Sequence, residues 1–138
     1  MKILTVSVAC YNVEKFVEEA LKPFTMEEVV NDIEVLVVND GSKDQTSALA
    51  HRFEKDYPNT FKVIDKENGG YGSTINTSLK IATGKYFKLL DGDDWYNPEY
   101  IRHYLDILKN SEEDLVITSG IWKEEGSGVE SYHAAFKD

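Results

Sequence analysis

The 138-residue sequence predicts an α/β fold, with a mainly parallel sheet covered by helices on both faces. Short apolar runs rich in β-branched residues alternate with segments of helical periodicity, which is typical of parallel strands joined by helices. The runs lack the polar alternation of a half-exposed strand, so we expect them to be buried on both sides. The length is that of one domain large enough to bury a core.

The elements follow one another as strand, turn and helix. Strands are expected over residues 3–9, 33–38, 61–64, 86–90 and 115–119, with a candidate strand at 121–122. Helices are expected over residues 16–21, 45–55 and 73–82, and from Pro98 to Leu108 behind the capping residue Asn97. Thr25 and Glu28 have the spacing of a capping box, which predicts a further short helix from Thr25.

Charge and cysteine content restrict the class of protein. The chain has 15 Lys and Arg against 25 Asp and Glu, a net charge of -10, which excludes a basic stripe for nucleic acid or anionic lipid. Cys10 is the single cysteine, so no internal disulfide is expected and a reducing compartment is the natural setting. No stretch approaches the ~20 apolar residues of a membrane span, so we expect a cytoplasmic protein whose membrane association, if it has any, uses other regions.

Three carboxylates crowd the loop that follows the strand at 86–90. Asp91, Asp93 and Asp94 lie within four residues, and adjacent like charges are tolerated when a cation, several donors or open water offsets their repulsion. Ligands of open α/β sheets bind just beyond the carboxyl ends of the strands, where this cluster falls. The pattern favours a divalent metal site, and a solvated acidic turn before the next helix is the alternative.

Two other loops could carry chemistry. Asp40 stands where the strand at 33–38 meets a turn, a ligand-facing position, although Asp40 and Ser42 could instead satisfy backbone donors. Residues 67–73 are glycine-rich and precede a helix, so their amides could meet an anion, or the loop could be merely permissive. It is not a dinucleotide fingerprint, because Ile75 occupies the position of the third glycine.

Taken together and in this order, the motifs resemble the nucleotide-sugar-binding half of a family 2 glycosyltransferase with the GT-A fold, a Rossmann-like fold of nucleotide-diphospho-sugar transferases. The resemblance covers about residues 3–118 and is carried by residues 7–12, 37–46, 68–70, 76, 82–86 and 91–94. It implies a set of donor-binding residues: Ala9, Tyr11, Asp40, Asn68, Gly69, Gly70, Asn76, Asp91 and Gly92.

The resemblance also implies individual roles. Tyr11 would line the base pocket, and Asp40 would accept a hydrogen bond from the uracil ring. Asp91 and Asp93 match the family's Asp-x-Asp motif, so Asp91 would face the ribose and the metal, and Asp93 would coordinate Mg²⁺ or Mn²⁺ bridging the diphosphate. A hard cation with oxygen ligands can join an acidic protein to a diphosphate. The sequence departs from the family at Ile75, where an arginine is usual, so a basic contact to the donor is absent from this set.

The function implied by the resemblance is that of an inverting glycosyltransferase, which transfers a sugar from a UDP-sugar to an acceptor hydroxyl in polysaccharide or cell-surface glycan synthesis. We expect residues 1–138 to form a single donor-binding domain that stops before the region of the acceptor and the general base. No catalytic residue is therefore assigned, and a glycan or lipid-linked acceptor would bind outside this chain.

Two other classes of protein share parts of the pattern. A nucleotidyltransferase has the same strand-helix layout and metal carboxylates, but it would have a glycine- and arginine-rich loop where this chain has residues 10–12. A receiver-like Mg²⁺-binding signalling domain would need Asp40 and Asp91 to share one metal.

Overall fold

A computed structural model of the chain describes residues 2–114, 116, 120–123 and 130–133. Within this part, one sheet has four parallel strands in the order β3-β2-β1-β4, which confirms the expected parallel α/β architecture. The strands are β1 (Leu4–Cys10), β2 (Ile33–Asp40), β3 (Phe61–Lys66) and β4 (Tyr86–Asp91). A separate antiparallel pair joins β5 (Gly120–Lys123) to β6 (Glu130–His133), so the candidate strand at 121–122 is confirmed.

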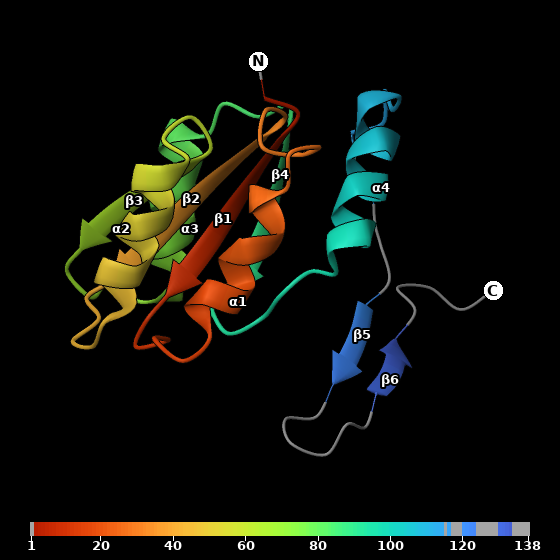
Figure 1. Cartoon of the computed structure of the whole chain (residues 1–138). Coiled ribbons are helices and arrows are strands. Elements are labelled where there is room, and N and C mark those ends of the chain that lie inside the picture. The colour runs from red at the N-terminus through yellow and green to blue at the C-terminus, as the bar shows by residue number, and fades with distance from the viewer. Residues whose placement is uncertain (1, 115, 117–119, 124–129, 134–138) are drawn as a thin grey trace.

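The helices cover both faces of the sheet (Figure 1). They are α1 (Val17–Leu21), the 3₁₀ helix η1 (Lys22–Thr25), α2 (Thr46–Asp56), α3 (Tyr71–Ile81) and α4 (Pro98–Lys109). Strands β1, β2 and β3 step across the sheet in one direction, so right-handed crossovers place α1 and α2 on the same face. The chain then returns past β1 to β4, which places α3 on the opposite face. The direction of winding therefore reverses between β1 and β4.

The core follows the periodicity of the sequence. Strands β1 and β2 are buried on both sides, including the polar Ser7, whose hydroxyl donates to Ser78 Oγ of α3 at 2.6 Å. This bond satisfies a polar group that burial would otherwise penalise. Helix α4 buries one stripe of side chains at helical spacing, made up of Ile101, Tyr104, Leu105 and Leu108. The central strands thus form a rigid platform whose carboxyl ends carry the loops.

The prediction of a short helix beginning at Thr25 is wrong. The Thr25 hydroxyl donates back to the carbonyl of Lys22 at 2.7 Å, so it closes η1 instead of capping a following helix. The amides of Val29 and Val30 both donate to the carbonyl of Met26, which gives a turn before β2 begins. The strand expected at 115–119 lies outside the described residues except for Val116.

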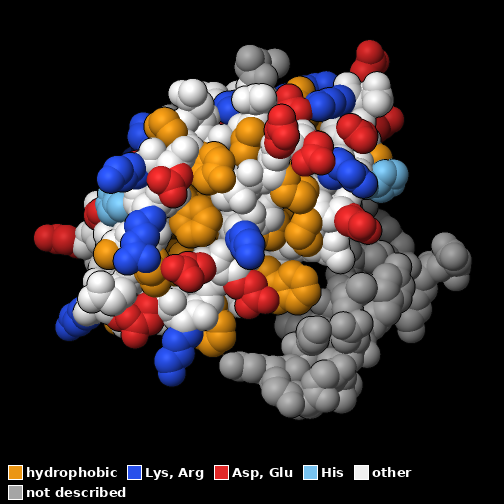
Figure 2. Space-filling model, in the orientation of Figure 1, with side chains coloured by type: hydrophobic (Ala, Val, Ile, Leu, Met, Phe, Trp, Pro, Cys, Tyr) orange, Lys and Arg blue, Asp and Glu red, His pale blue; other side chains and the backbone are white. Residues whose placement is uncertain are grey.

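The surface agrees with the acidic composition. On the face shown in Figure 2, Asp and Glu side chains lie among the Lys and Arg side chains, so the described residues form no continuous basic band on this face. In the described part of the chain, none of the helices combines the length and apolar character that crossing a bilayer requires.

Candidate functional site

A cleft of about 690 Å³ opens at the carboxyl ends of the strands, around the point between β1 and β4 where the winding reverses. This is where open α/β sheets bind ligands, and the volume is within the roughly 300–1,000 Å³ of small-molecule sites. The cleft is lined by Ala9, Cys10, Tyr11, Val13, Asp40, Asn68, Gly70, Tyr71, Thr74, Asp91, Gly92 and Asp93.

Most of the site residues predicted from the sequence meet in this cleft. Those that line it are Ala9, Tyr11, Asp40, Asn68, Gly70, Asp91, Gly92 and Asp93. Gly69 is not part of the lining, but its amide donates to Asp40 Oδ1 at 2.8 Å. Asn76 is exposed on α3 and does not line the cleft. The structure therefore brings the separate loops together as expected and leaves Asn76 outside the group.

The acidic loop after β4 forms one side of the cleft. Asp91, Asp93 and Asp94 are exposed, and each offers a carboxylate oxygen within 4.8 Å of the others. Partial desolvation of its carboxyl group, reinforced by the negative charges of Asp93 and Asp91, raises the pKa of Asp94. Several carboxylate oxygens at this spacing suit a hard divalent cation such as Mg²⁺ or Mn²⁺. Asp91 and Asp93 line the cleft as well, so a cation held there would face its interior.

Gly92 fixes this loop against β1. Its amide donates to the carbonyl of Ala9 at 2.8 Å, and a Cβ at position 92 would lie 2.7 Å from Cys10 Sγ. Only glycine fits such a close approach, so the turn that carries Asp91 and Asp93 is held tightly against the neighbouring strand.

Asp40 lies at the end of β2 and is bound by three donors. Lys66 Nζ and the Gly69 amide donate to Oδ1 at 2.9 and 2.8 Å, and the Gly70 amide donates to Oδ2 at 3.0 Å. Burial alone would raise the pKa of Asp40, but these hydrogen bonds and the Lys66 charge lower it overall. Asp40 is therefore an ionised acceptor, and the backbone donors that it satisfies come from the glycine-rich loop and not from its own turn.

The loops after β1 and β2 hold each other in place. The amide of Asn12 donates to Ser42 Oγ at 2.9 Å, and Asn12 Oδ1 accepts from the amide of Lys43 at 2.8 Å. The amide of Val13 donates to Thr46 Oγ1 at 2.9 Å. Ser42 thus has the structural role that the sequence left open. These bonds hold the segment that presents the 51% exposed Tyr11 ring at the cleft.

Sequence reasoning missed Tyr71 and Thr74 as cleft residues. Tyr71 is 52% exposed, and burial, followed by the charge and hydrogen bonding of Asp91, raises its pKa. The Thr74 hydroxyl donates to the carbonyl of Tyr71 at 2.6 Å. The sequence signal for Tyr71 was its position between Gly70 and Gly72. Two flanking glycines offer no side chains for a large aromatic ring to pack against, which indicates that the ring is available to a ligand.

Cys10 also lines the cleft but is suited to packing. It is 1% exposed, and burial, together with the charges of Asp93 and Asp44, raises the pKa of its thiol to about 12. The thiol is therefore neutral near pH 7, and a nucleophilic role is unsupported.

An open parallel sheet with a cleft at its switch point, lined by carboxylates and by part of a glycine-rich loop, is typical of an α/β domain with a small-molecule site. The family model for Glycosyl transferase family 2 matches residues 5–136, and the chain belongs to this family. Family membership supports neither the nucleotidyltransferase nor the receiver-like alternative.

Individual relatives agree with the family. An uncharacterized glycosyltransferase of Rickettsia prowazekii is 35% identical over 119 residues, which cover 86% of this chain and 36% of that protein. TarS of S. aureus in complex with UDP is similar with a TM-score of 0.71 and 27% identity, covering 94% of this chain and 38% of that one. The mannosyltransferase PcManGT from Pyrobaculum calidifontis, in complex with GDP-Man and Mn²⁺, gives a TM-score of 0.65 and 26% identity over 72% of this chain and 30% of that one.

These similarities confirm the expected GT-A, Rossmann-like fold. The chain spans 36% of the length of the Rickettsia relative and 38% of the TarS chain, so the comparisons concern one part of those proteins.

Proposed function

We propose that the chain is the donor-binding part of a glycosyltransferase and binds a UDP-sugar together with Mg²⁺ or Mn²⁺. The observation that carries the proposal is the cleft, which brings the carboxylates of Asp91 and Asp93 together with Asp40 and with Gly70 of the glycine-rich loop. TarS binds UDP and UDP-GlcNAc in its solved complexes, and PcManGT was solved with GDP-Man and Mn²⁺, which supports a nucleotide-sugar ligand here.

Each side of the cleft has a role in this proposal. Asp91 and Asp93 would hold the cation, whose positive charge would offset the repulsion between these carboxylates and the diphosphate and would stabilise the negative charge of the leaving group. Tyr11 lines the base pocket, and the ionised Asp40 accepts a hydrogen bond from the N–H of a uracil ring. Asp91 Oδ atoms also face the ribose. None of these groups is free to act as the general base.

For the whole protein, we propose that the sugar of the bound donor is transferred to an acceptor. An acceptor hydroxyl, on a glycan or a lipid-linked sugar, attacks the anomeric carbon of the donor as the UDP leaves, with inversion and loss of a proton to a general base. We assign this base and the acceptor site to regions beyond the described residues. Polysaccharide or cell-surface glycan synthesis at the cytoplasmic side of a membrane is the proposed setting.

Calorimetric titration of the chain with UDP tests the donor site. We expect binding with Mn²⁺ or Mg²⁺ and little binding in EDTA, because the carboxylates and the diphosphate repel each other without a cation. Asp93→Asn alters a proposed metal ligand. Losing only a hydrogen-bond partner of a metal ligand costs roughly tenfold or more in metal affinity, so we expect the metal-dependent affinity for UDP to fall by at least that factor. Asp56→Asn, an exposed carboxylate at the end of α2, is the matched control. Equal affinity for UDP with and without EDTA would contradict the metal site.

A further inference from the structure

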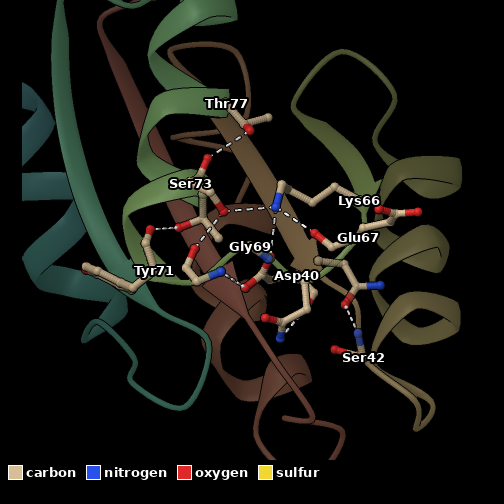
Figure 3. Close-up of polar contacts among 12 residues, drawn as sticks. Asp40, Ser42, Lys66, Glu67, Gly69, Tyr71, Ser73 and Thr77 are labelled. Atoms are coloured by element: carbon tan, nitrogen blue, oxygen red, sulfur yellow. Dashed lines mark hydrogen bonds and ion pairs between the residues drawn. The ribbon is translucent and has the colours of Figure 1, made fainter.

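Lys66 lies at the centre of the hydrogen bonds that shape the glycine-rich loop (Figure 3). Its ammonium donates to Asp40 Oδ1 at 2.9 Å, to the carbonyl of Glu67 at 2.7 Å and to Ser73 Oγ at 2.9 Å. These acceptors come from the end of β2, from the loop itself and from the first turn of α3. An ammonium group has three N–H donors, so the three acceptors use them all.

The partners of Lys66 are also the groups that hold the loop. Asp40 accepts from the amides of Gly69 and Gly70, and Ser73 Oγ donates to the carbonyl of Gly70 at 2.7 Å. A Cβ at position 69 would lie 2.9 Å from Lys66 Nζ and 2.8 Å from Ser73 Oγ. The ammonium therefore fits beneath the loop because residue 69 has no side chain.

The charge of Lys66 matters because, among the described residues, the charged ones that line the cleft are Asp40, Asp91 and Asp93, which are all acidic. The Asp40 side chain is only 6% exposed, and Lys66, at 22%, is its cationic partner. Removing one member of such a pair leaves the other charge unpaired and shielded from water, which destabilises the folded state far more than the loss of an exposed ion pair does. Lys66 does not itself line the cleft, so it can affect a ligand only through Asp40 and the loop.

We propose that Lys66 is a positioning residue for donor binding: it fixes the loop at Gly69 and Gly70 and directs the Asp40 carboxylate at the nucleotide base. This inference rests on the proposed function. Oδ1 is bound by Lys66 and the Gly69 amide, whereas Oδ2 receives only the Gly70 amide among the described contacts. Oδ2 therefore remains the acceptor for a ring N–H, which uracil has and cytosine lacks at the same ring position.

Affinities for UDP and CDP, each measured by calorimetry with Mn²⁺, test the inference on the Lys66→Met variant. We expect UDP affinity to fall by about tenfold or more, the cost of losing a charge-assisted hydrogen bond, and CDP affinity to fall less. General damage to the fold would lower both affinities equally, so the loss of preference for UDP identifies an action through Asp40. Lys62→Met is the matched control, because Lys62 is exposed on the same strand, and it should bind both nucleotides like the unsubstituted chain.

The possible results separate the inference from the proposed function. If the unsubstituted chain binds UDP and Lys66→Met keeps the same affinity and the same preference over CDP, the inference is wrong and the proposed function stands. If the unsubstituted chain binds no UDP with Mn²⁺, the proposed function itself is overturned.

Ser73→Ala provides a second variant in case Lys66→Met does not fold. It removes one acceptor of Lys66 together with the hydrogen bond from Ser73 Oγ to the Gly70 carbonyl, and it leaves the Lys66–Asp40 pair intact, so the fold should be retained. We expect faster hydrogen exchange at the Gly69 and Gly70 amides and a weaker preference for UDP over CDP. Unchanged exchange and unchanged preference would overturn the inference.

Discussion

Asp40 combines two roles that mutation can separate. It binds the amides of Gly69 and Gly70, and it lines the cleft as an ionised acceptor. Asp40→Asn keeps the shape but replaces one acceptor oxygen by a donor, which opposes a donor of the loop or Lys66 at either position and, at the position of Oδ2, also a ring N–H. We therefore expect UDP affinity to fall by about tenfold or more, with a smaller loss for ADP, whose base has no ring N–H to donate. Competition binding with the two nucleotides measures this difference, and equal losses would mean that Asp40 only holds the loop.

Single residues differ in how far the sequence could predict their role. Asp40, Asp91 and Asp93 were predictable because each stands at the end of an apolar strand, and parallel strands bring their carboxyl ends to one edge. Lys66 was not, because its partners Asp40 and Ser73 are 26 and 7 residues away and the contact depends on the register of β3 with β2. The tight fit of Gly69 around the ammonium depends on the same register.

Helix α2 and strand β3 are joined by a polar cluster around His51. Its Nε2 lies 2.7 Å from Asp65 Oδ2 of β3, and its Nδ1 lies 3.1 Å from Glu54 Oε1. Asp65 Oδ1 in turn accepts from Asn39 Nδ2 of β2 and from Ser47 Oγ, both at 2.8 Å. The cluster therefore links one helix to two neighbouring strands close to the loops of the cleft.

This cluster predicts a pH dependence of stability. Hydrogen bonding to Asp65 and then to Glu54, opposed by burial, raises the pKa of His51 above its ordinary 6.5. The group binds its proton more tightly in the folded state, so its contribution is fully present below pH 6.5 and is lost as the pH rises through the folded-state pKa. His51→Gln should thus lose more thermal stability at pH 6 than at pH 8. The effect should be small, because the His51 side chain is 43% exposed.

Thermal unfolding followed by circular dichroism at the two pH values measures this effect. His103→Gln is the matched control, because His103 is exposed on α4 and away from the cluster. A His51→Gln variant that loses the same stability at both pH values would show that the proton on His51 does not stabilise the fold.

At the scale of elements, apolar periodicity located the strands and helices within a few residues. The strand expected at 61–64 continues to Lys66, because Asp65 and Lys66 pair in register with Asn39 and Asp40 although their polarity suggests a loop. The helix predicted from Thr25 is absent although its local sequence favoured it. A capping-box spacing is a local signal, whereas in the structure Thr25 ends η1 and only residues 26–32 remain before β2, which is short for another helix.

For the whole molecule, the position of the cleft follows from the order of the strands. Alternating strands and helices predict a parallel sheet, but they do not say between which strands the winding reverses. The order β3-β2-β1-β4 puts that reversal between β1 and β4, so Ala9 and Asp91 become neighbours although they are 82 positions apart in the sequence. The motifs of the sequence indicated which loops would meet, but they did not show that Asn76 lies on an exposed face of α3 outside the cleft.

Residues 1–138 should bind the donor without transferring its sugar to an acceptor. In the described part of the chain, the carboxylates that line the cleft are Asp40, Asp91 and Asp93, and each already has a partner or a proposed cation. An acceptor hydroxyl would therefore find no base among them, and general-base assistance typically contributes about 10²–10⁴-fold. We expect this chain to bind UDP-sugar and release UDP only at a rate near background, with or without added acceptor sugars. A UDP-release assay measures this rate, with a glycosyltransferase of known donor and acceptor as the active control. Rapid acceptor-dependent release by residues 1–138 would place the base within this chain, outside the residues assigned to the donor.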